Sequence, residues 1–319
     1  MRPTARFGLG LALLSAVTFG TSGTFARSLI DAGWSAPAAI IARIGIASLV
    51  LAVPAAFALR GRWHVLRRNL GTVGVFGLLA VAGAQVAFFN AVRYLPIGVA
   101  LLLEYLGIIL VVGWMWVAHG QRPRRLTVAG SVAAMLGLAF VLDLTGGDRI
   151  DPVGVVWGLS AAIGLAVYFV LSARIDPELP SMAVASGGMA VGTGALVLLG
   201  AVGILPLHAT FGDVQFAGST MSWLVPILGL SLVAAVVAYI SGIGAARILG
   251  ARLSSFVGLT EVLFAVLIAW LVLDELPTPV QMLGGGLIVA GVVLVRIDEL
   301  RPERAGIDQD IRTPALVDA

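Results

Sequence analysis

The chain has 319 residues, of which 59% are hydrophobic and only 12% are charged, and its mean hydropathy is +1.03. A soluble protein of this length needs more polar residues to cover its surface, so the composition excludes a soluble enzyme and indicates a membrane protein. The net charge is +3 and no long basic block occurs, so nucleic acid is not an expected partner. With no cysteine, disulfides and thiolate metal sites are excluded.

Apolar runs of about 20 residues, each long enough to cross the hydrocarbon core, follow one another along the chain. Short breaks containing proline, glycine or polar residues separate them, and this pattern predicts an all-α integral membrane protein with ten transmembrane helices. The predicted helices are 8–27, 36–59, 69–92, 97–118, 126–144, 153–173, 181–204, 221–246, 252–273 and 278–296. The first is kept as a helix because "TFA" before Arg27 is a poor cleavage site. Residues 205–220 form the longest internal loop.

Arginine falls mainly in alternate loops, and positively charged loops stay in the cytoplasm. This predicts a multi-pass protein of the cytoplasmic (inner) membrane with both termini cytoplasmic. The inner segments then hold Arg2, Arg6, Arg60, Arg62, Arg67, Arg68, Arg122, Arg124, Arg125, Arg174, Arg247, Arg252, Arg296, Arg301, Arg304 and Arg312, and the outer loops hold Arg27, Arg93 and Arg149. The tail 298–319 loses the apolar pattern and is expected to be a disordered cytoplasmic extension.

An internal repeat appears when the chain is compared with itself at an offset of 154 residues. The matched pairs are Arg93 and Arg247, Leu95 and Leu249, Trp116 and Trp270, Pro123 and Pro277, Gly130 and Gly284, and Gly137 and Gly291. An offset of 145 matches "LSA" at 14–16 with 159–161 and "ID" at 30–31 with 175–176. The chain therefore divides into two related five-helix halves, 1–150 and 151–297.

Because five is odd, the second half must cross the membrane in the opposite sense to the first. Inverted repeats of this kind are typical of alternating-access carriers, in which one bundle moves against another around a site near the midplane. Duplication can also be merely an economical way to build a helix bundle.

Two stretches carry a family resemblance that covers about 8–296. "DELPTPVQMLGGGLIVAGVVLV" at 274–295 resembles the closing helices of EamA-type members of the drug/metabolite transporter superfamily. "AVRYLPIGVALLLEYLGIILVVGWMW" at 91–116 resembles the bacterial threonine/homoserine exporter subgroup in its "P-x-G-x-A…E" run. The first half departs from the pattern, because "HGQRP" at 119–123 stands where the second half has "LDELP" at 273–277. The resemblance implies efflux or exchange of small metabolites such as amino acids.

Three ionisable residues lie inside the predicted helices, where each costs roughly 2.5–3.5 kcal/mol on insertion scales and usually faces a cavity or a partner. Arg43 and Glu104 each lie seven residues from the outer start of their helices, at about 10 Å depth, so they could pair. Glu261 lies about 13 Å deep from the inner side, one helical turn after Gly258, the repeat equivalent of Glu104.

Polar residues at similar depth complete the predicted site. Gln85 lies at the level of Glu104, and the offset of 154 places it on Tyr239. The predicted substrate-binding or coupling residues are therefore Arg43, Gln85, Glu104, Tyr239 and Glu261, with Asn90, Tyr105 and Tyr168 as secondary candidates that more often join helices.

Two interpretations of Arg43 and Glu104 stay open at this point. They could form a buried ion pair that fixes helix packing, or they could bind a zwitterionic small-molecule substrate, with Arg43 taking a carboxylate and Glu104 an ammonium group. Glu104 could also take up a proton as the cavity opens. The structural and functional interpretations can hold together, since a pair that breaks when substrate enters is a usable switch. Besides the substrate, membrane lipid is the expected partner.

The sequence offers little for enzymatic chemistry. The three histidines lie in separate loops, no metal-ligand spacing appears and no cofactor is expected. A flippase or carrier for a lipid-like or other amphipathic substrate is an alternative with the same architecture. A nucleotide-sugar carrier needs several cations for its phosphates, and only Arg43 is present at membrane depth.

Overall fold

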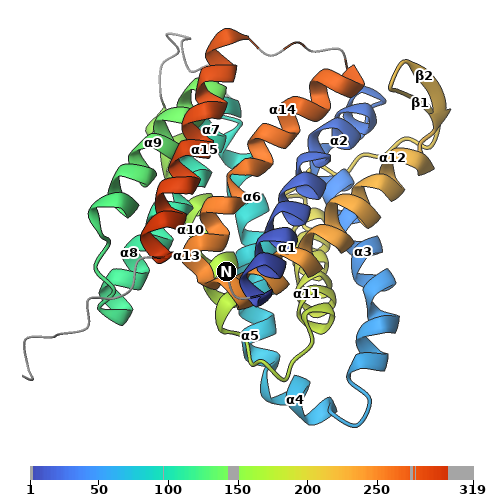
Figure 1. The fold of residues 1–319 in the computed structure, drawn as a ribbon. Coiled ribbons are helices and arrows are strands. Elements are labelled where there is room, and N and C mark those ends of the chain that lie inside the picture. Colours follow the sequence, from blue (N-terminus) through green and yellow to red (C-terminus); the bar gives the residue numbers. More distant parts are fainter. Residues whose placement is uncertain (1–2, 96, 143–150, 274–275, 277, 301–319) are drawn as a thin grey trace, which may run out of the picture.

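The computed structural model describes residues 3–95, 97–142, 151–273, 276 and 278–300, and this part of the chain forms a bundle of helices (Figure 1). The first half contains α1 (Pro3–Gly20), α2 (Ser22–Asp31), α3 (Ala36–Ala58), α4 (Trp63–Arg68), α5 (Leu70–Val75), η1 (Phe76–Gly83), α6 (Ala84–Ala91), α7 (Ile97–Tyr105), α8 (Gly107–His119) and α9 (Arg125–Val141). The second contains α10 (Pro152–Arg174), α11 (Ser181–Ala201), β1 (Asp213–Phe216), β2 (Ser219–Ser222), α12 (Leu224–Leu228), η2 (Gly229–Val237), α13 (Ala238–Gly258), α14 (Thr260–Leu273) and α15 (Pro279–Leu300).

Helix is present in every one of the ten predicted segments. Within the described residues, eight helices are long and apolar enough to cross a membrane, and two apolar helices, Arg125–Val141 and Thr260–Val272, are shorter. The predicted acidic turn at Asp274 and Glu275 and the tail from residue 301 lie outside the described residues.

A short β-hairpin lies between two helices in the described part of this otherwise all-helical chain. Asp213 pairs with Ser222 and Phe216 with Ser219, so the strands occupy part of the predicted loop 205–220 and the first residues of the predicted eighth helix. Ala217 and Gly218 between the strands both have positive φ, 51° and 72°, as a two-residue type I′ turn requires. The helix therefore begins only at Leu224.

Several long helices are interrupted, and the interruptions match between the halves. The π-helical segment η1 begins at Phe76 and η2 begins at Gly229, an offset of 153, close to the repeat of 154. The breaks between α7 and α8, at Leu106, and between α13 and α14, at Leu259, are also 153 residues apart. α13 itself bends at Gly250, whose φ of 80° is left-handed. π-helical segments of this kind occur frequently at functional sites.

Glycine allows α9 and α15 to approach closely. A Cβ at Gly130 would lie 2.7 Å from the carbonyl oxygen of Gly291, and a Cβ at Gly137 would lie 2.6 Å from that of Gly284. The residue numbers run in opposite directions along the contact, so the two helices are antiparallel. At the repeat offset of 154, Gly130 corresponds to Gly284 and Gly137 to Gly291. The contact of Gly130 with Gly291 is therefore the repeat equivalent of the contact of Gly137 with Gly284.

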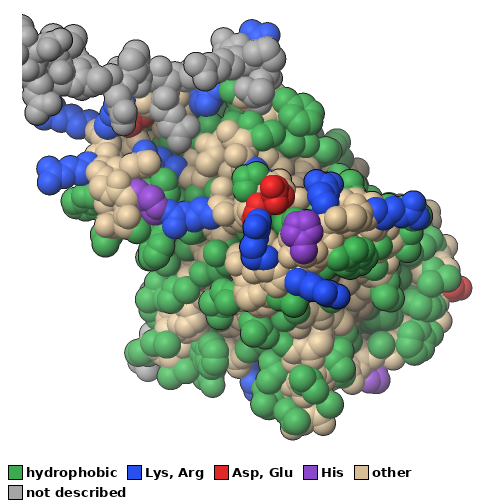
Figure 2. Space-filling view, turned by 90° about the horizontal axis from the view of Figure 1, so that it is seen from below, with side chains coloured by type: hydrophobic (Ala, Val, Ile, Leu, Met, Phe, Trp, Pro, Cys, Tyr) green, Lys and Arg blue, Asp and Glu red, His purple; other side chains and the backbone are tan. Residues whose placement is uncertain are grey.

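The bundle has two different ends. The α4 end, at the bottom of Figure 1, contains α4 and the loops 120–124 and 175–180, and the hairpin end contains β1, β2 and the loop 32–35. Figure 2 shows the α4 end, where arginine side chains gather around acidic and histidine side chains. Hydrogen bonds join arginine-rich segments here: Arg174 contacts His119 at 3.2 Å, and Arg252 donates to the Gln121 side chain at 3.3 Å.

Candidate functional site

A cavity of about 400 Å³ lies among helices from both halves and is here called the central cavity. It is lined by seven of the eight residues predicted from the sequence: Arg43, Gln85, Glu104, Tyr105, Tyr168, Tyr239 and Glu261. Asn90 is not among its lining residues; its side-chain nitrogen donates to the Val86 carbonyl of its own helix at 2.8 Å. The lining continues to Ile30 and Ala36 at the hairpin end, and Ile30 is 44% exposed.

Arg43 does not pair with Glu104, although the matched depths made such a pair an open expectation. Its Nη2 donates instead to the backbone carbonyl of Ala234 in η2, and its Cζ lies 5.7 Å from the ring centroid of Phe19. The ionisable groups within its electrostatic reach are Tyr239 and Glu261. Helix rotation explains the difference, since equal depth leaves the direction of two side chains free and each residue turns the helix by about 100°.

The two carboxylates have different surroundings. Glu261 is within hydrogen-bonding reach of the Tyr105 hydroxyl and within electrostatic reach of both Arg43 and Glu104. Glu104 has no hydrogen bond or ion pair to any other described residue, and it faces the cavity half-buried from α7. The cavity thus holds one guanidinium and two carboxylates, of which Glu104 is the one that has no partner among the described residues.

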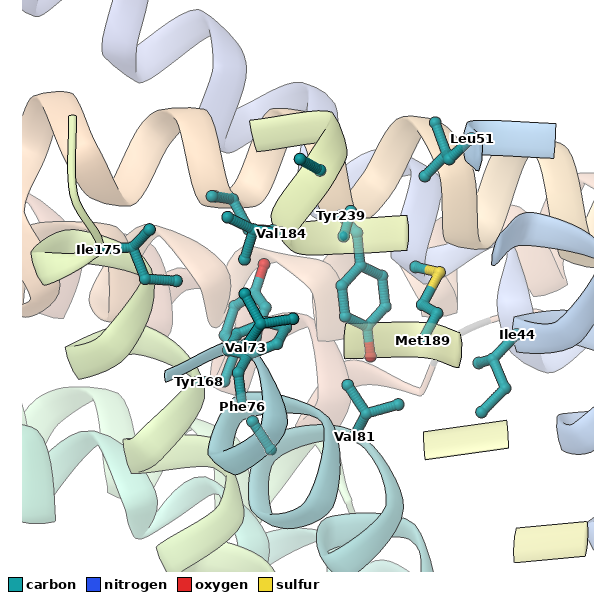
Figure 3. Close-up of a cluster of buried hydrophobic side chains, with 14 of the residues drawn as sticks. Ile44, Leu51, Val73, Phe76, Val81, Tyr168, Ile175, Val184, Met189 and Tyr239 are labelled. Atoms are coloured by element: carbon teal, nitrogen blue, oxygen red, sulfur yellow. The ribbon is translucent and has the colours of Figure 1, made fainter. Parts of the chain in front are cut away.

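A row of aromatic rings lines the deep side of the central cavity. Phe19 lies 5.2 Å from Tyr239, and Tyr239 lies 5.7 Å from Tyr168, measured between ring centroids. Figure 3 shows Tyr168 and Tyr239 among apolar side chains of the same cluster, such as Phe76 and Met189. That cluster extends to Val65, Ile175 and Leu179, so packed side chains fill the space between the cavity and the α4 end.

Three polar atoms around the cavity are buried and have no hydrogen-bond partner among the described residues: Arg43 Nε, Ser22 Oγ and the Tyr168 hydroxyl oxygen. Leaving such a group unpaired costs about 1–3 kcal/mol, so each of them gains from a ligand that accepts or donates a hydrogen bond. Gly242 provides the space for the Tyr168 hydroxyl, which would lie 2.2 Å from a Cβ at that position.

Sequence reasoning missed most of the cavity lining, including the side chains of Phe19, Ser22, Phe88 and Phe89. Helical spacing could have indicated two of them, because Phe88 and Phe89 follow the candidate Gln85 by three and four residues. Such positions share one helix face with a residue that was already a candidate.

Among the described residues, no group of three or more potential metal-ligating side chains occurs. A second groove, also about 400 Å³, lies between η1, α6, α10 and α11 and is almost wholly apolar. Its serine, Ser160, donates its hydroxyl to the Val156 carbonyl at 2.8 Å, so that hydroxyl is already satisfied within its own helix. The charged and hydrogen-bonding groups therefore point to the central cavity as the candidate site.

Comparisons with known proteins agree with a transporter architecture. Residues 6–143 and 152–297 each match the EamA-like transporter family. An uncharacterized inner membrane transporter, YicL, of Salmonella typhimurium is 25% identical over 313 residues, which cover 95% of this chain and 99% of that protein. A probable terminal-alkyne amino-acid exporter of Streptantibioticus cattleyicolor is 26% identical over 287 residues, covering 89% and 91%. A protein of known crystal structure has the same fold, with a TM-score of 0.74 at 19% identity, covering 91% and 96%.

Proposed function

The chain belongs to the EamA-like transporter family, and from that premise we propose that it is a secondary carrier of the inner membrane that exports amino acids or related small metabolites by alternating access. The family match confirms the resemblance seen in the sequence. Two relatives support the finer proposal, because one is described as an inner membrane transporter and another as a probable amino-acid exporter.

The proposal includes ten spans in two inverted halves, with the shorter helices α9 and α14 counted as spans. Three observations support it. The π-helical segments and the helix breaks recur at nearly the repeat offset. In the antiparallel contact of α9 and α15, Gly130 packs against Gly291 and Gly137 packs against Gly284. The repeat offset converts each of these pairs into the other, as a two-fold relation between inverted halves requires. The family match also occurs once in each half.

The α4 end is proposed to face the cytoplasm, because it carries the arginine-rich segments and positively charged loops stay inside. The hairpin end then faces outward, and both termini are cytoplasmic. Since the central cavity reaches Ile30 at the hairpin end and a packed core lies below it, this arrangement corresponds to an outward-open state.

The observation that carries the proposal is the charge content of the central cavity. A zwitterion requires a cation for its carboxylate and an anion for its ammonium group, and Arg43, Glu104 and Glu261 supply both in one space. Buried charges in proteins are paired or neutralised, because an isolated one is costly. Glu104, which has no protein partner among the described residues, is therefore proposed to bind the ammonium group or, when the cavity is empty, a proton.

The test is a metabolite panel on cells with and without the protein, followed by uptake into proteoliposomes with imposed pH gradients. We expect accumulation outside the cells of one or a few amino acids or related amines, and pH-gradient-dependent flux of the same compounds in vesicles. Vesicles without protein and vesicles with an Arg43→Ala variant are the controls. Export of none of these compounds, together with movement of a labelled phospholipid between leaflets, would overturn the proposal in favour of a flippase.

A further inference from the structure

The two ends of the bundle carry equivalent acidic residues in different states. Asp176 follows α10 at the α4 end, and Asp31 closes α2 at the hairpin end; the offset of 145 makes them repeat equivalents. The Asp176 side chain is 17% exposed, whereas that of Asp31 is 70% exposed. The aspartate at the α4 end is thus partly covered, whereas the aspartate at the hairpin end, which the central cavity reaches, is exposed.

Asp176 joins the two halves of the chain. Its Oδ2 accepts hydrogen bonds from the Arg68 guanidinium of α4 and from the Asn69 side-chain nitrogen, the latter at 3.2 Å. Its Oδ1 accepts the backbone N–H of Glu178 at 3.0 Å, which fixes the loop. Arg68 also lies 3.5 Å from the Glu178 carboxylate. One carboxylate therefore ties the loop 175–180 to α4 across the half boundary.

A second arginine lies near this cluster without direct contact. Arg247 of α13 is within electrostatic reach of Asp176, and its Nε and Nη2 are buried with no hydrogen-bond partner among the described residues. The repeat equivalent of Arg247 is Arg93, which is exposed near the hairpin end. The aspartate and the arginine are thus close at the closed end, and both equivalents are exposed at the other end.

In a carrier built from inverted repeats, the two halves exchange conformations when the open side changes. Resting on the function proposed above, we propose that Asp176 and Asp31 are alternate latches: Asp176 holds the α4 end closed through Arg68, and Asp31 pairs with Arg93 when the hairpin end closes. In the present structure, the Asp31 carboxylate lies 3.8 Å from the Nε of Arg27, one turn earlier on α2. Closing the hairpin end then adds a pair that the present state lacks.

The natural chain contains no cysteine, so single cysteines report access to each end without background. Ser172→Cys, at a fully buried position in α10 one turn before Asp176, reports opening of the α4 end. Gly23→Cys, on the cavity lining where a Cβ would meet open space, reports access from the hairpin end. Both are measured as labelling rates with a small membrane-impermeant maleimide in vesicles of either orientation.

We expect Asp176→Asn to raise labelling of Ser172→Cys several-fold and to lower that of Gly23→Cys. Asp31→Asn should change both rates in the opposite direction. The charge exchange Arg68→Asp with Asp176→Arg should return both rates toward those of the unmodified latch. Arg67→Gln is the matched control, because Arg67 is exposed on the same helix as Arg68 and has no hydrogen bond or ion pair among the described residues, so both rates should stay unchanged.

Unchanged rates in Asp176→Asn, or an increase at both reporters, would overturn the proposal; the latter would mean unfolding, not a change of open side. Failure of the charge exchange to restore the rates would also count against a direct pair. The labelling rates are measured without any transported compound, so they do not depend on the substrate class proposed above. The metabolite panel, in turn, does not depend on whether Asp176 and Asp31 act as latches.

Discussion

The two halves of the chain place one carboxylate each on equivalent, interrupted helices, yet they give these carboxylates different surroundings. Glu261 has the Tyr105 hydroxyl beside it and Arg43 within electrostatic reach, whereas Glu104 faces the cavity with no hydrogen-bond or ion-pair partner among the described residues. The repeat makes the helices equivalent but not the carboxylates, because Glu104 precedes the break at Leu106 and Glu261 follows the break at Leu259. The side chains around each carboxylate therefore set what it can do. A partnered carboxylate contributes to structure, and an unpartnered one is available to a ligand.

The strongest test of this difference is Glu104→Gln. Losing a hydrogen bond to a charged group costs about 1.5–3 kcal/mol, which corresponds to roughly a 10- to 150-fold loss in apparent affinity. We expect transport of a zwitterionic substrate in proteoliposomes to be lost or to become independent of pH, with the melting temperature unchanged. Full transport with its normal pH dependence would show that Glu104 binds neither the substrate nor a proton.

Glu261→Gln should affect stability as well as transport. The change removes an anion near Arg43 and weakens the contact with Tyr105, so we expect roughly tenfold weaker transport, the equivalent of about 1.4 kcal/mol, and a lower melting temperature. Tyr105→Phe removes the hydroxyl alone and should cost about 1 kcal/mol of stability.

A double-mutant cycle tests the contact between Tyr105 and Glu261. The stability effects of Tyr105→Phe and Glu261→Gln should be non-additive, because the two groups share one contact. Additive losses would mean that Tyr105 does not support Glu261.

Substitutions at the glycine contact between α9 and α15 test whether close packing joins the two halves. Gly137→Ala places a Cβ 2.6 Å from the Gly284 carbonyl oxygen, so thermal unfolding in detergent should show a loss of about 1–3 kcal/mol. Gly286→Ala, two residues after Gly284 on α15, places a Cβ that meets no atom within 4 Å and should be neutral or stabilising by about 0.5–1 kcal/mol. Equal effects of the two substitutions would exclude close packing as the reason for glycine at position 137.

The smallest expected effect concerns pH at the α4 end. The backbone N–H of Glu178, together with Arg68 and Asn69, lowers the pKa of Asp176 to about 2 from its usual 3.8. Because the folded pKa is depressed, the stabilisation is fully present above about pH 4 and is lost only as the pH falls toward 2. In a Glu104→Gln background, which removes the proposed proton site, maleimide labelling of Ser172→Cys should therefore be independent of pH between 5 and 8 after correction for thiolate reactivity. A pH-dependent opening in that range would assign the latch to another group.

Much of the site could be predicted because the signals are local. Ionisable residues in apolar runs identified Arg43, Glu104 and Glu261, and the repeat offset connected Gln85 with Tyr239; all five line the central cavity. Asn90 was a poorer prediction, since an amide that bonds to its own helix looks the same in sequence as one that faces a cavity. Phe19 and Phe88 were missed because apolar residues are too common in a membrane chain to stand out.

The sequence by itself determined the helical segments, the repeat and the family, because hydropathy, spacing and residue identity are properties of neighbouring positions along the chain. Only the tertiary structure decided that Arg43 meets the Ala234 carbonyl and not Glu104, that a hairpin precedes α12, and that the cavity reaches one end while Asp176 ties the other. These contacts depend on helix rotation and crossing within a few ångströms, and about 100° of rotation per residue leaves depth unchanged while it changes every partner.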